Sequence, residues 1–227
     1  MPRTLDLDTW PRRATFDFFR TFDKPYFNVC TRLDVTALVA LKPRLPGGLM
    51  LAYHHLVMRL ANEIEPFRYR VHGDRVQVLD VVHASVAVLC HDDSIGFAYL
   101  PYDPDPVRFA AAAAPVVAAV QRGDLPFDPG LDQAAHLHFT TLPWIDFSSF
   151  SHARNWGRED SIPKFAFGRL QREGERWAMA LSIEVHHALM DGLHVGHLVQ
   201  ALEARLQDPA RWVGAADPSP GGLQAGR

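Results

Sequence analysis

The chain has 227 residues, 48% of them hydrophobic and 22% charged, which is typical of a globular protein with one large or two small domains. Its formal net charge of −3 provides no global basic field for nucleic acid or an anionic membrane, so we expect neither partner. No apolar run could span a bilayer, the first ten residues lack a signal-peptide core, and the two cysteines are expected to be reduced thiols, so we predict a cytoplasmic protein.

The N-terminal half is predicted to alternate between helices and short strands. Aromatic residues at helical spacings and a long apolar run mark the helices. The predicted helices cover residues 12–22, a short segment ending at Leu41, and residues 49–63. The predicted strands cover residues 26–33, 67–70, 75–81 and 85–89. Asp34 or Thr36 could cap the short helix, and His72-Gly73-Asp74 is suited to a hairpin turn.

The C-terminal half continues the same mixture. The predicted helices cover residues 107–122, with a kink at Pro115, and 193–206; the predicted strands cover residues 136–142, 164–171 and 177–185. Since the order shows no regular βαβ repeat, we predict an α/β protein of the α+β kind, a mixed β-sheet flanked by helices. We expect one domain over residues 1–213 and a disordered tail over residues 214–227.

The chemistry is expected in the segment from Ser182 to Gly196, because it holds His186, His187 and His194 and is followed by His197, so that four of the chain's 12 histidines cluster there. A predicted strand ends at His186-His187, and a short loop then leads through Asp191-Gly192 into a helix. A histidine at a strand end is rigidly placed, and an imidazole titrates near neutral pH, which suits proton abstraction from an alcohol. Asp191 could hold the loop by an ion pair or by backbone N–H bonds.

Two other interpretations of this segment stay open. The histidines could be packed side chains whose hydrogen bonds are satisfied in the core. His187, Asp191 and His194 could also supply nitrogen and oxygen ligands to a metal ion. However, no cysteine or second acidic residue joins them at metal-site spacing. We therefore predict no metal site and favour a general base.

The string HHALMDG, followed by LHVGHL, resembles the HHxxxDG signature of the chloramphenicol acetyltransferase family. Peptide-synthetase condensation domains and plant acyltransferases share this signature, but the chain is too short for their two lobes. Further blocks resemble the family in the same order: Trp10-Pro-Arg-Arg-Ala-Thr-Phe16, Leu33-Asp-Val-Thr36, Asn62 with Phe67-Arg68, and Leu142-Pro-Trp144 with Phe147, Ser149 and Phe150. The resemblance extends from about residue 10 to 206, and the chain is identified as a member of this family.

The resemblance implies a coenzyme A-dependent acyltransferase-like fold and a homotrimer with active sites at the subunit interfaces. Acetyl-CoA would be a cosubstrate, with no tightly bound cofactor, and a small-molecule alcohol would be the acceptor. His187 would be the base that deprotonates the acceptor hydroxyl, which attacks the thioester directly. Asp191 would pair with Arg12 and hold the loop. Thr140 stands where the family has a serine that stabilises the oxyanion, and threonine keeps that O–H donor.

The resemblance also implies binding residues. Positions in or beside the acceptor pocket match Phe18, Phe19, Phe97, Phe150, His152 and Ala166, and positions near coenzyme A match Trp144 and Arg169. Ala166 and His152 depart from the family, which has threonine and leucine there, so the reaction type is better supported than the substrate. Three hypotheses remain: an acetyltransferase for which chloramphenicol is a possible acceptor, a relative that acylates another hydroxylated metabolite, and a non-catalytic homologous trimer.

Overall fold

The long C-terminal strands build the middle of the molecule. We describe a computed structural model in which residues 2–128, 134–155 and 160–215 are placed. Strands β8 (Lys164–Glu173) and β9 (Arg176–His186) pair antiparallel around Gly174, whose positive φ of 63° suits glycine. Apolar residues alternate along β9, where Leu181, Ile183 and Val185 are fully buried. This period of two directs one face of the hairpin into the core.

Six strands form the main sheet, in the order β2-β9-β8-β7-β5-β6. The other four are β2 (Tyr26–Asp34), β5 (His83–Leu89), β6 (Ile95–Leu100) and β7 (His136–Thr141). β7 runs parallel to both of its neighbours, and the remaining pairs are antiparallel. The sheet is therefore mixed, as predicted, and β9 is an interior strand.

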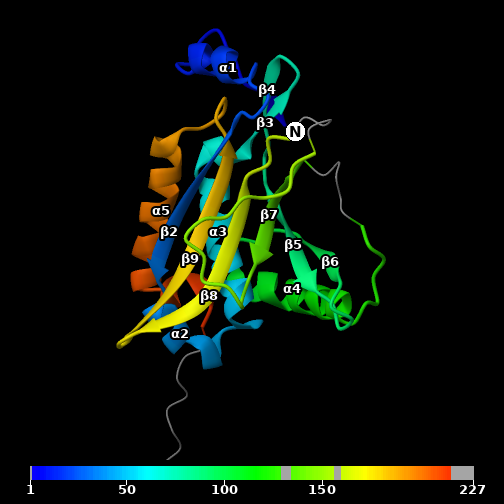
Figure 1. Cartoon of the computed structure of the whole chain (residues 1–227), viewed down its shortest axis with the longest axis vertical. Helices are drawn as coiled ribbons and strands as arrows, with labels where there is room; N and C mark the ends of the chain where they lie inside the picture. Colours follow the sequence, from blue (N-terminus) through cyan, green and yellow to red (C-terminus); the bar gives the residue numbers. More distant parts are fainter. Residues whose placement is uncertain (1, 129–133, 156–159, 216–227) are drawn as a thin grey trace, which may run out of the picture.

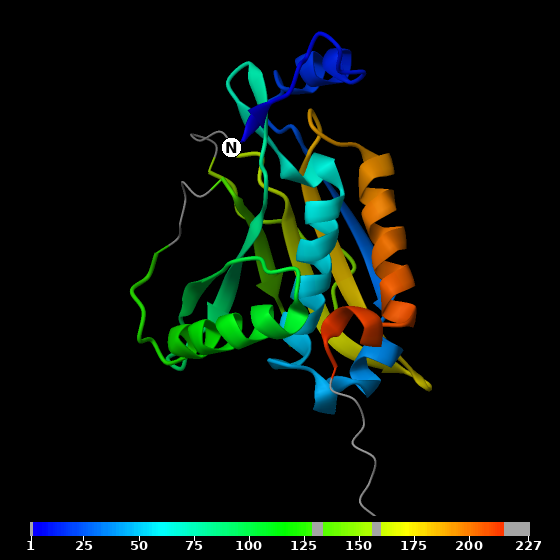
Figure 2. The same ribbon diagram turned by 180° about the vertical axis from the view of Figure 1, so that it is seen from behind.

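Helices cover one face of this sheet, called the inner face below (Figures 1 and 2). They are α3 (Gly48–Glu63) and α5 (Gly192–Gln207), which lie side by side, and α4 (Pro106–Gln121), which packs against β5 and β6. The opposite, outer face carries no helix among the described residues, and the segment after β7 crosses it in front of β8 and β9 (Figure 1).

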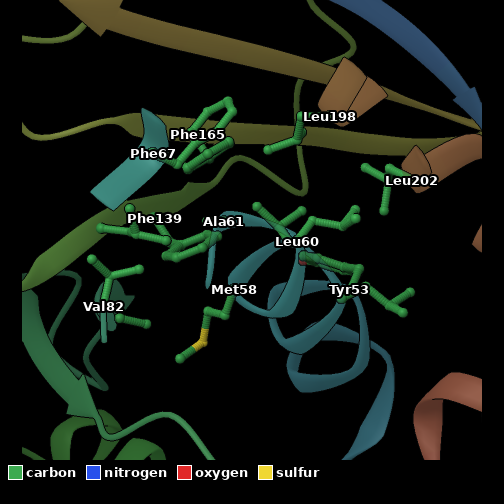
Figure 3. Close-up of a cluster of buried hydrophobic side chains, with 14 of the residues drawn as sticks. Tyr53, Met58, Leu60, Ala61, Phe67, Val82, Phe139, Phe165, Leu198 and Leu202 are labelled. Carbon is green, nitrogen blue, oxygen red and sulfur yellow. The ribbon is translucent and has the colours of Figure 1, made fainter. Parts of the chain in front are cut away.

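The core lies between α3 and the inner face of the sheet. Figure 3 shows Phe139 and Phe165 of β7 and β8 close to Phe67 and to Met58 and Leu60 of α3. The rings of Phe139 and Phe165 stack with centroids 5.3 Å apart. All of these side chains are at most 1% exposed. Burial of this apolar surface supplies the main driving force for folding.

Shorter elements gather at the two ends of the sheet. Helix α1 (Arg13–Phe19) and a three-stranded sheet lie at one end, where β1 (Arg3–Thr4), β4 (Arg75–Val78) and β3 (Tyr69–His72) pair in that order. Helices α2 (Thr36–Ala40) and α6 (Ala210–Val213) and the 3₁₀ helix η1 (Lys42–Arg44) lie at the other. In the described part of the chain, no helix combines the length and hydropathy needed to cross a membrane.

Two local predictions were wrong. Phe67 and Arg68 do not begin a strand but belong to the 3₁₀ helix η2 (Glu65–Arg68), because Pro66 fixes φ near its helical value, and β3 begins only at Tyr69. The cap residue of α2 is Val35, but the Asp34 carboxylate accepts a hydrogen bond from the N–H of Thr36, the first residue of the helix, at 3.0 Å. The Thr36 hydroxyl does not cap the helix and accepts a hydrogen bond from the Trp177 N–H at 2.8 Å. For Thr36, a contact 141 residues away in sequence takes the place of the predicted cap.

Further differences concern elements and the tail. Strand β6, the short β1 and helix α6 were not predicted, and α4 continues through Pro115. The predicted hairpin turn is present, with Gly73 at a φ of 61°. Residues 216–227 of the predicted tail lie outside the described residues.

Asn62 gives a test of how α3 is joined to the sheet. Its amide donates to the carbonyls of Met58 and Val82 and accepts from the Val82 N–H, at 2.8–3.0 Å. Val82 is fully buried. Asn62→Ala should therefore lower the free energy of unfolding by ~2–4 kcal/mol, because two buried backbone groups lose their partner. Urea unfolding measures this change, and Glu203→Ala on exposed α5 surface is the control. An Asn62→Ala variant as stable as the control would contradict this role.

Candidate active site

His187 lies directly after β9, and its ring is held on three sides. The backbone N–H of His187 donates a hydrogen bond to the Pro25 carbonyl at 2.6 Å. The ring stacks on Phe19, with centroids 3.9 Å apart and planes at 11°, and packs at 4.7 Å against Phe27. Nδ1 lies 3.1 Å from the Met190 carbonyl oxygen. Because a carbonyl can only accept, Nδ1 carries the proton, and Nε2 of the neutral ring keeps a lone pair.

The loop after His187 is fixed by its own apolar residues. Ala188, Leu189 and Met190 are fully buried. The N–H groups of Leu189 and Met190 both bond to the His186 carbonyl, at 3.0 and 3.1 Å, which closes a tight turn. The sequence therefore places three core residues between the histidine pair and Asp191, and the turn cannot leave the core without exposing them.

Asp191 forms both contacts that the sequence left as alternatives. One oxygen of Asp191, Oδ1, accepts a hydrogen bond from the Leu193 N–H at 3.1 Å and lies 2.8 Å from Nδ1 of His194. Asp191 thereby caps the start of α5. The other, Oδ2, forms an ion pair with Arg12, whose side chain is 17% exposed. Partial burial raises the pKa of Asp191, but Arg12 and His194 outweigh it and hold that pKa below its ordinary value.

The Arg12 guanidinium also contacts the backbone of the candidate base, His187. Its Nη2 lies 3.4 Å from the His187 carbonyl oxygen, so one side chain contacts both the histidine and the aspartate of the motif. Arg12 is therefore not the exposed surface charge that an isolated arginine would suggest. Among the described residues, no group of three or more histidine, cysteine, aspartate or glutamate side chains is arranged to hold a metal ion.

Thr140 lies on the outer face of the sheet, far from His187 of the same chain. The register aligns Thr140 with Ala166 and Ser182 on the next two strands. Two strand spacings and five residues along β9 separate Thr140 from His187 by roughly 19 Å. A hydroxyl and a base must lie about 3 Å from the same reacting group. One chain alone does not bring these two residues together.

The residues predicted to bind the acceptor fall into separate groups. Phe18, which is 60% exposed, and Phe19 lie in α1 beside His187, and their rings contact each other and Phe22. Phe150 covers the outer face, where it packs with Phe147 against Ala166 and Ala180. Ala166 is fully buried by this cover.

Phe97 and the residues predicted to lie near coenzyme A occupy other places. Phe97 lies on β6, next to Phe127, at the edge of the sheet away from β2. Trp144 follows the end of β7 and is 59% exposed. The Arg169 N–H of β8 donates to the carbonyl of Ile145 at 2.8 Å, so Trp144 and Arg169 lie at the same end of the sheet.

A polar row beside Thr140 was missed by the sequence analysis. It crosses the whole outer face and consists of Asn28, Glu184, Lys164, His138, Ser85 and Tyr99. Arg154 binds Glu184 and Asp160 over this row and stacks 3.5 Å above the Tyr26 ring. Alternation along β7 and β9 gave a signal, since His138 and Glu184 share a face with Thr140 and Ser182.

His152, the departure from the family in the predicted pocket, joins this polar row. Its ring packs edge-on to Phe150 at 4.8 Å, and its Nδ1 lies 4.0 Å from the Glu184 carboxylate. Both ring nitrogens are buried and have no hydrogen-bond partner among the residues that the structure describes. Burial and the nearby Lys164 lower the pKa of His152 to about 3, so the ring is neutral at physiological pH.

A cavity of about 750 Å³ opens beside the His187 backbone, at the end of the outer face near α1. Pro25, Tyr26, His186, Arg154 and Asp160 are among the residues that line it. Two of the lining residues adjoin the candidate base. The Pro25 carbonyl accepts a hydrogen bond from the His187 backbone N–H, and His186 precedes His187 in the chain.

The model of the family described as chloramphenicol acetyltransferase matches residues 2–203. The chain belongs to the chloramphenicol acetyltransferase family. A chloramphenicol acetyltransferase of Streptomyces acrimycini is 33% identical over 212 residues, which cover 92% of this chain and 96% of the relative. Chloramphenicol acetyltransferase 2 of Escherichia coli is 29% identical over 201 residues, which cover 88% and 94%. Membership of this family identifies the chain as an acetyltransferase.

Solved structures show the same fold. A chloramphenicol acetyltransferase superposes with a TM-score of 0.79 at 23% identity, covering 91% of this chain and 100% of the other. A dihydrolipoamide acetyltransferase of Azotobacter vinelandii superposes with a TM-score of 0.66 at 14% identity, covering 87% of each chain. The predicted acyltransferase-like fold is therefore confirmed.

Buried neutral histidines predict how the stability of this acetyltransferase depends on pH. Burial lowers the pKa of His54 and His152 to about 3 and that of His138 and His186 to about 4, and nearby Lys164 or Arg154 adds to the effect for the last three. Below the ordinary value of 6.5, the unfolded chain binds protons that the folded chain does not. The free energy of unfolding should therefore fall from pH 6.5 to 4, by about 1 kcal/mol per pH unit for each histidine.

Urea unfolding at pH 7.5, 6.5, 5.5 and 4.5 measures this dependence. His54→Leu should reduce the slope of the free energy of unfolding against pH by the contribution of one histidine, because residue 54 no longer binds a proton on unfolding. A midpoint that stays constant from pH 6.5 to 4.5 would show that these histidines are not held neutral in the folded state.

Proposed function

We propose that this chain transfers an acetyl group from acetyl-CoA to a hydroxyl group of a small-molecule acceptor, with His187 as general base. The observation that carries this proposal is the contact between Nδ1 of His187 and the Met190 carbonyl. It fixes the tautomer in which Nε2 can accept a proton. The stack on Phe19 and the bond to Pro25 fix the ring and the backbone.

The reaction needs no acyl-enzyme. Nε2 of His187 takes the proton of the acceptor hydroxyl as its oxygen forms a bond to the thioester carbonyl carbon. The Thr140 hydroxyl donates to the resulting oxyanion. When the carbon–sulfur bond breaks, the leaving thiolate takes the proton back from the imidazolium, so the free thiol and the acetyl ester are released. An oxyanion donor of this kind is worth ~2.7–4 kcal/mol of transition-state stabilisation.

Arg12 and Asp191 act by position in this scheme. Their ion pair holds the loop that carries the Met190 carbonyl, and Arg12 also contacts the His187 carbonyl. A base must be held to within about 0.5 Å of its productive place. Neither side chain has to exchange a proton with the substrate.

The active site is shared between subunits of a homotrimer in this proposal. His187 and Thr140 lie roughly 19 Å apart within one chain, which is too far for one reaction centre. The outer face around Thr140 carries no helix in the described ranges, and it can receive the end of a second subunit that carries α1 and His187 (Figure 1). Cyclic symmetry then makes three equivalent sites.

The acceptor pocket and the acetyl-CoA site follow from the same arrangement. Phe18, Phe19, Phe97 and Phe150 supply aromatic contacts for the acceptor, together with His152 and Ala166, and Trp144 and Arg169 lie where acetyl-CoA binds. Chloramphenicol is a candidate acceptor, which would make the protein an antibiotic-resistance enzyme. A different hydroxylated metabolite is the alternative, because His152 and Ala166 depart from the family. A non-catalytic trimer would have no use for the fixed tautomer of His187.

His187→Ala should lower kcat by ~10²–10⁴-fold, the usual contribution of general-base catalysis, with little change in melting temperature. The assay follows free-thiol release from acetyl-CoA with a panel of alcohols that includes chloramphenicol. His197→Ala, at an exposed position on α5, is the matched control. A His187→Ala enzyme that keeps the wild-type rate would remove His187 as the base. No release by the wild type with any alcohol would favour the non-catalytic trimer.

Mixing two inactive subunits tests the shared site. His187→Ala and Thr140→Ala subunits, co-expressed in equal amounts, should recover activity, because some interfaces combine an intact His187 with an intact Thr140. Random assembly gives this combination at about a quarter of the sites of a cyclic trimer. Sedimentation checks the trimer. Activity no higher than that of the separate variants would show that both residues act within one subunit.

A further inference from the structure

Thr141, the neighbour of Thr140, places a hydroxyl group on the inner face of the sheet. Adjacent residues of a strand point to opposite faces, so Thr140 faces outward and Thr141 faces α3. The surrounding inner face is apolar, with Phe139, Phe165 and Phe167 at most 1% exposed. A hydroxyl in such surroundings costs free energy unless it finds a hydrogen-bond partner.

Two consecutive residues of α3 provide these partners. The hydroxyl of Tyr53 lies 3.2 Å from Oγ1 of Thr141, and Nε2 of His54 lies 3.5 Å from the same atom. Tyr53 is 6% exposed and His54 is fully buried. Their rings pack against the strands, Tyr53 at 4.4 Å from Phe167 and His54 at 4.7 Å from Phe139. The three polar groups thus form a small cluster enclosed by aromatic rings.

The cluster keeps one protonation state over the range in which an enzyme works. Burial raises the pKa of Tyr53 to about 12 and lowers that of His54 to about 3. Both side chains are therefore neutral between these limits. The hydrogen bonds to Thr141 therefore do not change with pH in this range, and they connect β7 to α3 at every working pH.

The connection lies where β7 ends. Thr141 is the last residue of the strand, and the next backbone bond, from the Leu142 N–H to the Phe167 carbonyl, is 2.8 Å long. Strand ends open more readily than strand centres because fewer bonds hold them. A rotation of the chain at Thr141 would turn the Thr140 hydroxyl as well, since the two residues share a peptide unit. The contacts with α3 restrain this rotation.

We propose that Tyr53 and His54 act through Thr141 as positioning residues for the Thr140 hydroxyl. This inference rests on the proposed function, in which Thr140 donates to the oxyanion. The bonds on the inner face hold the strand end so that the outward hydroxyl points at the reacting carbonyl. Oxyanion stabilisation depends on this kind of preorganisation, because the donor must already point at the developing charge.

A double-mutant cycle tests the connection. Thr141→Val keeps the shape of the side chain and removes its hydroxyl. We expect kcat to fall about tenfold, less than the 10²–10³-fold loss expected for Thr140→Ala, because the donor is misplaced but present. KM for the acceptor should stay within about twofold, because substrate binding does not use Thr141. Tyr53→Phe should lower kcat by a smaller factor, since His54 remains as a partner.

The decisive comparison is made in the Thr140→Ala background. There, adding Thr141→Val should cause no further loss of kcat, because the residue it positions is absent. Thr141→Ser, which restores the hydroxyl, should restore kcat. Thr31→Val, a half-buried threonine of β2 outside the proposed site, is the control for removing a strand hydroxyl. Melting temperatures of all variants ensure that each assay is run on folded protein.

The outcomes separate this inference from the proposed function. A tenfold loss that persists in the Thr140→Ala background, or wild-type kcat in Thr141→Val, would overturn the positioning role while leaving the acetyltransferase intact. Wild-type kcat in Thr140→Ala would overturn the oxyanion role and, with it, the positioning of that hydroxyl. A purely structural role would lower the melting temperature of Thr141→Val and leave kcat unchanged.

Discussion

The ion pair between Arg12 and Asp191 is the constraint on which the candidate site depends. It joins the residue before α1 to the loop after β9, which are 179 positions apart in the sequence. The Asp191 carboxylate also caps the first turn of α5, and the Arg12 guanidinium also contacts the His187 backbone carbonyl. Because the Arg12 side chain is only 17% exposed and that of Asp191 is 34% exposed, removing Asp191 would leave the more buried charge without its partner. The orientation of the base thus depends on the N-terminal segment being docked.

The two faces of the main sheet carry different kinds of side chains. The inner face carries Phe139, Phe165 and the other apolar side chains that pack against α3, whereas the outer face carries Thr140 and the polar row that includes His138 and Glu184. Alternation along a strand allows neighbouring residues to serve both purposes. As a consequence, the polar groups of Tyr53 and His54, which contact Thr141, are enclosed in the core.

In the proposed function, the reaction type and the choice of acceptor depend on different parts of the molecule. The fold is shared with acetyltransferases at 14–23% identity, so it does not distinguish their acceptors. The base and its loop lie at the end of β9, and they depend on contacts within one chain. The residues that depart from the family, His152 and Ala166, lie on the outer face near Thr140. If these residues bind the acceptor as proposed, changes there would alter the acceptor without disturbing the loop that carries the candidate base.

The sequence by itself determined the features that depend on local patterns. These are the buried character of α3, the two strands β8 and β9, and the strand–loop–helix segment that carries His187 and Asp191. They follow from side chains two to four residues apart, which a sequence shows directly. The family resemblance, and not local spacing, implied that Arg12 pairs with Asp191, and the structure shows this ion pair. Only the tertiary structure decided that Thr36 bonds to Trp177 and that Thr141 meets Tyr53. Such contacts join distant segments, because strand register and helix packing bring them together, and neither can be derived from local spacing.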